Sequence, residues 1–111
     1  MNVVDISGAR SAFKILQTTP RVQTAVMRLK AGEASGPEKE VHEGSDQVVL
    51  VMEGDLVAQV GDEEDRKLPA GSSLIIPADT PHRLVNRGKT EVRVYTCYAP
   101  PAYADDGEEK G

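Results

Sequence analysis

The sequence contains few large aromatic side chains: its 111 residues include no tryptophan, one phenylalanine and three tyrosines. It also has a single cysteine, Cys97, which excludes a framework of internal disulfide bonds. With so few aromatic rings, the core has to be built mainly from Val, Leu, Ile, Ala and Met together with the tyrosines.

Long hydrophobic runs and an excess of positive charge are also missing. No apolar stretch approaches the roughly 18 residues of a membrane-spanning helix, and residues 1–10 lack the apolar centre of a signal peptide. The formal net charge is −5 and the isoelectric point is about 5.0, which argues against nucleic acid or an anionic membrane as a partner. We therefore expect a cytoplasmic protein.

The chain does contain many short β-branched and aliphatic runs separated by Gly and Pro. This pattern is typical of an all-β sandwich or barrel. At 111 residues it predicts a single domain, large enough to bury about two-thirds of the surface of the unfolded chain. Residues 53–55 and 87–90 have the composition of hairpin turns, with Gly54 free to adopt a positive φ.

A predicted strand between Gln47 and Met52 is apolar on both faces. Alternation places Gln47, Val49 and Val51 inward and Val48, Leu50 and Met52 outward. A strand with two apolar faces is normally covered on both sides. In so small a protein the second cover is most simply another copy of the chain, so the pattern predicts a homodimer.

The stretch 71–86 places a histidine at the mouth of a strand. A short apolar strand over 73–76 is followed by a tight corner between Pro77 and Pro81, and the chain leaves that corner at His82. A histidine held by a rigid corner is well placed for chemistry, although the same position also suits a structural turn residue.

A second polar cluster lies upstream and consists of Glu40, His42 and Gln47. Period 2 sends Glu40 and His42 to one face, and a closed barrel would bring Gln47 and His82 to the same interior. Burying one unpartnered polar group costs roughly 2–7 kcal/mol, and a shared cation would satisfy all four groups. Two imidazoles, a carboxylate and an amide oxygen suit Fe(II), Mn(II), Ni(II) or Zn(II).

Together the two clusters resemble the paired motifs of the cupin superfamily. The first motif, G-x5-H-x-H-x3–4-E-x6-G, is matched by Glu40, His42, Gln47 and Gly54. The second, G-x5-P-x-G-x2-H-x3-N, is matched by Gly71, Pro77, His82 and Asn86, with Asp79 in place of the middle glycine. The resemblance spans about residues 20 to 100 and leaves 101–111 as an acidic tail whose last residues we expect to be mobile.

The resemblance implies a small single-domain (monocupin) jelly-roll barrel, or double-stranded β-helix, with one divalent metal ion near its mouth. The metal ligands carry over to His42 and His82. Gln47 stands where the motif usually has Glu, and Glu40 stands where it usually has the first His. Glutamine at that position occurs in some small metal-binding cupins, including a branch similar to the uronate-processing protein of pectin breakdown. The inward side chains expected to form the substrate pocket are Met27, Val49, Val51, Leu84 and Tyr98.

The leading hypothesis is a metal-dependent enzyme acting on a small polar metabolite, with isomerase, tautomerase or dioxygenase-type chemistry. Glu40 would serve as a catalytic base only if it is not a metal ligand. The alternative is a non-catalytic small-molecule-binding or sensor cupin whose metal is structural or absent.

Several residues also have plainer interpretations. Glu40 would then face solvent, Gln47 would be a strand-end amide that satisfies backbone groups, and Asn86 would tie a strand end to a neighbouring loop. Arg83 and Arg93, if they point inward, could bind a substrate carboxylate through two parallel hydrogen bonds.

Overall fold

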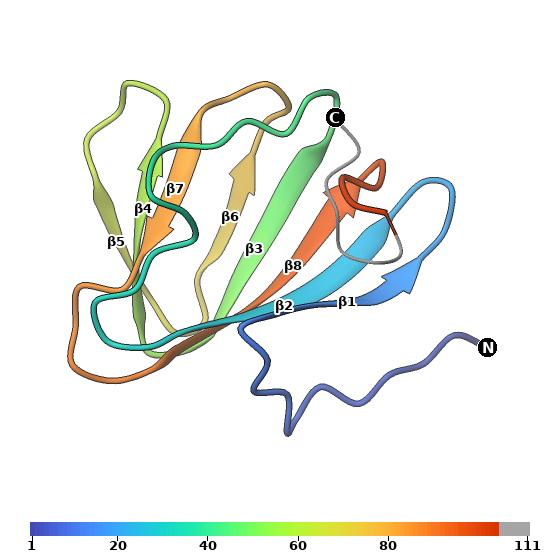
Figure 1. Ribbon diagram of the computed structural model, residues 1–111, viewed down its shortest axis with the longest axis horizontal. Coiled ribbons are helices and arrows are strands. Elements are labelled where there is room, and N and C mark those ends of the chain that lie inside the picture. Colours follow the sequence, from blue (N-terminus) through green and yellow to red (C-terminus); the bar gives the residue numbers. More distant parts are fainter. Residues whose placement is uncertain (105–111) are drawn as a thin grey trace.

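The computed structural model describes residues 1–104 as a two-layered arrangement of β-strands (Figure 1). The strands are β1 (Phe13–Thr18), β2 (Gln23–Leu29), β3 (Asp46–Glu53), β4 (Asp55–Val60), β5 (Arg66–Pro69), β6 (Ser73–Ile76), β7 (His82–Val85) and β8 (Val92–Ala99). One antiparallel sheet has the order β1-β2-β8-β3-β6, and the second has the order β5-β4-β7. The predicted all-β fold is confirmed, and within residues 1–104 no helix could cross a membrane.

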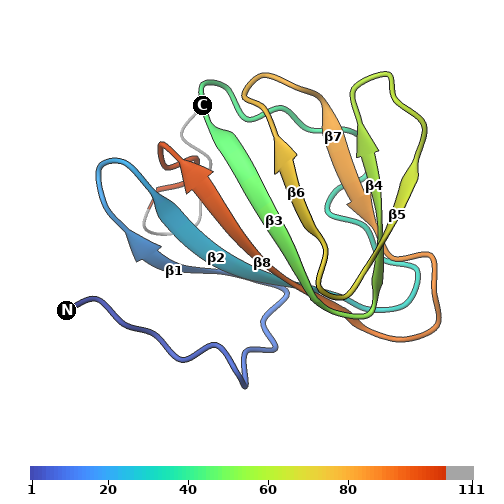
Figure 2. The ribbon, with the colours of Figure 1, turned by 180° about the vertical axis from the view of Figure 1, so that it is seen from behind.

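The inward faces of the two sheets form one hydrophobic core. Seen from behind, the larger sheet curves from β1 to β6 while β5, β4 and β7 close the other side (Figure 2). Because the chain has few large aromatic rings, aliphatic side chains fill this core. The buried core residues are Leu29, Val49, Val51, Leu56, Ala58, Leu68, Ile76, Leu84, Val92 and Val94.

The alternation predicted for β3 is present in the structure. Val49 and Val51 are almost completely buried, whereas Val48 is 38% and Leu50 is 39% exposed. β3 pairs with β8 on one side and with β6 on the other, so it lies inside the larger sheet. Its outward face carries apolar side chains that nothing within the described chain covers fully.

The predicted hairpins at residues 53–55 and 87–90 are wrong as pairings. β3 and β4 belong to different sheets, as do β7 and β8, so both segments carry the chain across the sandwich. Gly54 does have the expected positive φ, 82°, and a Cβ there would lie 2.5 Å from the carbonyl oxygen of Glu91. The turn residues were identified correctly, but their composition does not encode which strands pair.

The segment 32–40 extends the smaller sheet along β7. Asn86 and Ser35 donate their backbone N–H groups to Glu33 and Leu84, at 2.8 Å each. Further along, Glu40 and His82 form an antiparallel bridge with two backbone hydrogen bonds of 2.8 Å. This segment therefore fixes one wall of the space between the sheets.

Asn86 has the structural role that was anticipated. Its side chain is almost fully buried, and its Nδ2 donates to the carbonyl oxygens of Leu29 at 3.0 Å and Thr90 at 2.8 Å. Its Oδ1 accepts a hydrogen bond from the backbone of Gly88. The amide thus ties the end of β7 to the end of β2.

The segment after β8 belongs to the barrel over its first residues. Pro101 and Ala102 are buried, and Tyr103 forms part of a second small core with Ala25 and Tyr98. The first residues after the span of about 20 to 100 therefore pack on the barrel, at the end of the larger sheet. The mobile tail was expected over the last residues, and 105–111 lie outside the described part of the chain.

Candidate metal and ligand site

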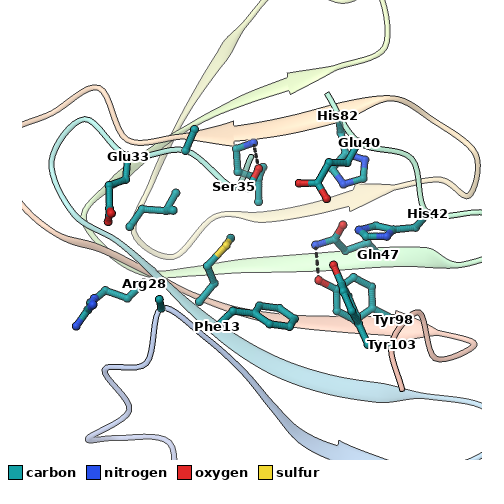
Figure 3. Close-up of a pocket in the computed structure, with 15 residues that line it drawn as sticks. Phe13, Arg28, Glu33, Ser35, Glu40, His42, Gln47, His82, Tyr98 and Tyr103 are labelled. Carbon is teal, nitrogen blue, oxygen red and sulfur yellow. Dashed lines mark hydrogen bonds between the residues drawn. The ribbon is translucent and has the colours of Figure 1, made fainter. Parts of the chain in front are cut away.

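A cavity of about 350 Å³ lies between the two sheets, beside the segment 32–40. Its volume falls at the lower end of the 300–1,000 Å³ typical of small-molecule sites. One end is polar, and the remainder is lined by aliphatic side chains and Phe13 together with Ser35, Arg28 and Glu33 (Figure 3). The polar end is lined by Glu40, His42, Gln47, His82, Tyr98 and Tyr103.

Strand register delivers the amide of Gln47 to this end. Gln47 on β3 lies opposite Tyr98 on β8, and Tyr98 in turn lies opposite Gln23 on β2. All three side chains are buried and share the inward face of the larger sheet. These three polar side chains therefore form a row across the inward face of the sheet, at a position where apolar side chains would otherwise extend the hydrophobic core.

His82 is oriented by its own corner and by the neighbouring segment. Its backbone is fixed by the two-way bridge to Glu40, and its ring Nδ1 lies 2.9 Å from the carbonyl oxygen of Thr80. A carbonyl oxygen can only accept, so Nδ1 carries the proton. In the neutral ring the lone pair then belongs to Nε2, which is the arrangement usual for a metal-ligating histidine.

His42 is aligned with His82 by hydrogen bonds between the two loops that carry them. The backbone N–H of Asp79 donates to the carbonyl oxygen of His42 at 3.1 Å, and the Asp79 carboxylate accepts from Gly44 at 3.0 Å. A further bond runs from the Ala78 backbone to the carboxylate of Asp46, at 2.8 Å. The proline corner and the loop of His42 therefore form one hydrogen-bonded unit.

Asp79 occupies the position of the middle glycine in the second motif, and its conformation and contacts explain why aspartate is suitable there. It is the non-glycine residue with a positive φ, 64°, in the described chain. Asp tolerates this left-handed conformation better than most residues. Glycine would adopt it more easily, but only a side chain with an acceptor can bond the loop of His42.

The two imidazoles meet, as the sequence predicts. Their ring centroids are 4.9 Å apart, and both residues are buried, with 6% exposure for His42 and 5% for His82. Metal–nitrogen bonds to histidine are about 2.0–2.1 Å long. Rings at this separation can contribute nitrogens to a single ion.

Gln47 contributes an amide oxygen with an unfilled hydrogen-bonding capacity. Its Nε2 donates to the hydroxyl oxygens of Thr96 at 3.0 Å and Tyr98 at 3.4 Å, which fixes the direction of the amide. Its Oε1 is buried and has no hydrogen-bond partner among residues 1–104. Because the amide bonds side-chain hydroxyls, its interpretation as a strand-end group satisfying the backbone is wrong.

Glu40 lines the cavity rather than pointing away from it, and Figure 3 shows its carboxylate directed inward beside His82. Gly36 makes room for this carboxylate, because a Cβ there would lie 2.7 Å from Glu40 Oε1. Residues 1–104 contain no group of three or more His, Cys, Asp or Glu side chains arranged to hold a metal.

The donors that fit a metal ion are the two imidazoles and the amide oxygen of Gln47. The buried Oε1 without a partner is the observation that favours a cation, since an unpaired buried acceptor costs roughly 1–3 kcal/mol. Nitrogen and neutral oxygen donors suit first-row divalent ions. His42, His82 and Gln47 would hold the ion, and the metal content of a Glu40 variant would test whether Glu40 is a fourth ligand, as the sequence predicts.

Tyr98 keeps its proton at this site. Burial raises the pKa of its phenol well above the usual value, and the adjacent Tyr103, whose side chain is its hydrogen-bonding partner, raises the pKa further. The ring centroids of Tyr98 and Tyr103 lie 5.1 Å and 5.7 Å from that of His42. A neutral phenol beside an imidazole is a hydrogen-bond donor at any physiological pH.

The predicted pocket residues divide into two groups. Met27, Leu84 and Tyr98 line the cavity, as expected. Val49 and Val51 also face inward, but they belong to the hydrophobic core, where facing side chains of the smaller sheet fill the space. They do not line this cavity, so their assignment to a substrate pocket stays a prediction.

Neither predicted arginine faces the cavity. Arg83 Nε donates to the carbonyl oxygen of Gly36 at 2.8 Å, and Arg93 Nε donates to Glu53 at 2.8 Å. Arg93 also donates to the carbonyl oxygen of Ala9 in the N-terminal segment. Both guanidinium groups serve the structure, so a role in binding a substrate carboxylate is excluded for this arrangement.

Several residues of the site were not anticipated, among them Ser35, Arg28 and Glu33 on the cavity wall and the group of Phe13, Gln23 and Tyr103. Phe13 and Tyr103 line the cavity, and Gln23 bonds the backbone of Tyr103. Phe13, Gln23 and Tyr103 lie outside the two motifs, towards the two ends of the chain. The available signal was the polar Gln23 at an inward position of a strand whose other inward residues are apolar.

Comparison with known proteins identifies the family. A family model described as Cupin domain matches residues 25–98. The chain is a cupin.

Solved structures support the assignment, and this cupin superposes closely on two of them. BH2720 from Bacillus halodurans is 29% identical, with a TM-score of 0.83 over 92% of this chain and 83% of that one. TT1209 from Thermus thermophilus is 26% identical, with a TM-score of 0.80 over 90% of this chain and 98% of that one.

Among curated proteins, the cupin is 32% identical to the uncharacterized protein L612 of Acanthamoeba polyphaga mimivirus over 90 residues, which is 78% of this chain. The chain spans about half the length of the curated relatives it matches, 55% in the case of L612.

Proposed function

We propose that this cupin is a metal-dependent enzyme acting on a small polar metabolite, with isomerase, tautomerase or dioxygenase-type chemistry. The observation that carries the proposal is the buried Oε1 of Gln47, which no group in the described part of the chain hydrogen-bonds, at the cavity end where His42 and His82 meet. The cupin family includes metal-dependent enzymes. A bound divalent ion would supply a Lewis acid for ligand oxygens or, with iron, a centre for dioxygen chemistry.

The protein's own groups would position the ligand and handle its protons. The Tyr98 phenol would stay neutral and donate to a ligand oxygen. The carboxylate of Glu40, which faces the cavity, would act as general base or acid. It would take a proton from, or return one to, the ligand carbon or oxygen adjacent to the oxygen that Tyr98 bonds. Met27 and Leu84 would exclude water from the rest of the ligand.

Elemental analysis of protein purified without a metal-chelating tag tests the ligand assignment. We expect about one divalent ion per chain in the natural protein and in Glu40→Gln. His42→Ala and His82→Ala should retain less than a tenth of it while keeping the β-sheet circular-dichroism spectrum. Gln47→Leu should lower metal content, whereas Gln59→Leu on β4 serves as the matched control and should not.

Full metal content in either histidine variant would refute the site. Glu40→Gln separates enzyme from binding protein: metal content should be unchanged while turnover of small acids, followed by absorbance or oxygen uptake, falls at least 100-fold. A metal-loaded natural protein that binds such acids but turns none of them over would support the non-catalytic alternative.

A further inference from the structure

Another cavity, of about 270 Å³, lies between β5 and β6 and shares no residue with the cavity of the histidines. β6 is the last strand of the larger sheet and β5 is an outer strand of the smaller one (Figure 2). The volume lies below the 300–1,000 Å³ of small-molecule sites, so the cavity suits one or two side chains of a larger partner. Its apolar lining consists of Ala58, Val60, Leu68, Leu74, Ile75 and Pro77.

The backbone of β6 has one edge that no strand of residues 1–104 covers. In an antiparallel pair, only every second residue exchanges hydrogen bonds with the partner strand. The Val51 N–H on β3 donates to Ser72 just before β6, at 2.9 Å, so the even-numbered residues of β6 continue that series. Opposite Ile75, the carbonyl oxygen of Val48 accepts from Thr96 on β8 instead, at 2.9 Å. The backbone N–H and C=O of Ile75 therefore point to the open edge.

The side chains along this edge are apolar on both faces of the sheet. Ile75 is 65% exposed, which makes it the most exposed large hydrophobic residue of the eight strands. Leu74 packs against the hydrophobic core on the inward face, and both residues line the cavity. The cavity therefore follows the open edge of β6. A strand placed beside that edge would bond the backbone of Ile75 and cover its side chain.

The rim of this cavity carries more negative than positive charge. Glu63 and Glu64, in the turn between β4 and β5, line it together with Arg66. Neither glutamate has an ion pair or a side-chain hydrogen bond within the described part of the chain, whereas the neighbouring Asp65 is bonded to Arg87 at 2.7 Å. Two carboxylates against one guanidinium favour a partner with Lys or Arg at this end.

We propose that the open edge of β6 and the cavity beside it bind an extended segment of another protein, with alternate apolar side chains and a flanking Lys or Arg. The segment adds a sixth strand to the larger sheet, next to β6. Its backbone pairs with Ile75. Side chains on one face of the segment fill the cavity, and its basic residue contacts Glu63 and Glu64.

Titration of ¹⁵N-labelled protein with a synthetic peptide, followed by NMR, tests the proposal. The probe is Lys-Val-Thr-Val-Thr-Lys with blocked termini, whose lysines stand at both ends because an added strand can run in either direction. We expect saturable binding in which hydrogen exchange of the Ile75 amide slows about tenfold, because its N–H gains a partner. The amides of β1, the edge strand at the other end of the sheet, should be unchanged.

Two N-methylated isomers of the peptide test whether the backbone pairs. Alternate residues of a strand turn their N–H groups to the same edge, so methylating both valines blocks one edge and methylating both threonines blocks the other. One isomer should bind as the parent peptide does, and the other should bind about tenfold more weakly, since it loses its hydrogen bonds to β6. Equal binding of the two isomers would overturn the added strand.

Charge variants test the acidic rim. Glu63→Gln combined with Glu64→Gln should weaken peptide binding about threefold, the size expected for exposed ion pairs. Glu38→Gln combined with Glu43→Gln removes the same charge from exposed positions outside this cavity, and it should leave binding unchanged. An equal loss in both double variants, or a peptide that does not bind saturably, would overturn the proposal. A dimer that the peptide dissociates would assign the edge to a second copy of the chain and overturn the partner proposed here.

Discussion

Asp79 shows how a single residue can serve the site without touching a ligand. It combines a left-handed backbone, φ 64°, with a carboxylate that accepts the Gly44 N–H. The two features have separate energetic consequences. The left-handed conformation costs a residue with a Cβ about 1–2 kcal/mol, and the hydrogen bond returns part of that cost.

Substitutions at Asp79 should separate these consequences. Asp79→Ala loses the acceptor and keeps the steric cost, so we expect a loss of about 1–3 kcal/mol in the free energy of unfolding. Asp79→Asn keeps an acceptor and tolerates the conformation, so its loss should be less than about 1 kcal/mol. Asp79→Gly should fall between them. Urea denaturation measures all three, and an alanine variant as stable as the glycine variant would contradict this account.

At the scale of the strand, the crossing between the sheets depends on Gly54. Its φ is 82°, and any Cβ would approach the Glu91 carbonyl oxygen to 2.5 Å. Gly71 has a similar φ, 93°, but no atom lies within 4 Å of a Cβ placed there. The two glycines therefore share a conformational cost and differ in the steric one.

This pair yields a matched test. Gly71→Ala should cost about 1–2 kcal/mol of unfolding free energy, the usual cost of the left-handed conformation. Gly54→Ala should cost at least about 2 kcal/mol more, since a backbone carbonyl cannot move aside as a flexible side chain would. Thermal and urea unfolding provide the comparison. Equal losses in the two variants would show that the crossing relaxes around the added methyl group.

Alternation and turn chemistry predicted the strands well but not their partners. The inward positions of β3 could be inferred because period 2 fixes the face of each residue once one is known. The crossings at Gly54 and at residues 87–90 could not, because a glycine turn looks the same whether it joins paired strands or separate sheets. Pairing depends on long-range packing that local composition does not record.

The outward face of the larger sheet bears on the whole molecule. Val48 on β3 lies opposite Ile75 on β6, which is 65% exposed, and Leu50 is 39% exposed on the same face. Strand β3 thus carries apolar side chains on both surfaces. The homodimer stays a prediction, and this face is where we expect the second copy to pack.

Light scattering after size-exclusion chromatography tests the homodimer. We expect a particle of two 11.9 kDa chains at micromolar concentration. Ile75→Glu would bury a carboxylate in the interface and should convert it to a single chain. Val3→Glu, in the exposed N-terminal segment, is the control and should leave the mass unchanged. A natural protein that runs as one chain at about 100 μM would refute the prediction.

The motif spacing predicted the centre of the site but not its margin. His42, Gln47 and His82 meet because the barrel brings two short sequence patterns to one end, and both patterns are visible in the sequence. Tyr103 could not be predicted, since its position depends on the buried Gln23 amide and on the chain folding back after β8. Contacts of this kind join a side chain to a distant stretch of backbone, so no residue spacing in the sequence predicts them.

The attachment of Tyr103 to Gln23 has a consequence for divergence among related barrels. The side chain of Gln23 hydrogen-bonds the backbone N–H and C=O of Tyr103, and every amino acid except proline has both groups. Replacing the tyrosine therefore alters what is presented to the ligand without releasing the main chain that presents it. The side chain of Tyr103, in contrast, packs against Phe13 and Tyr98, so a replacement there would exchange ring contacts as well as the group that faces the cavity. Variation at this position therefore combines a change in the cavity wall with a change in packing, while the main chain stays bonded to Gln23.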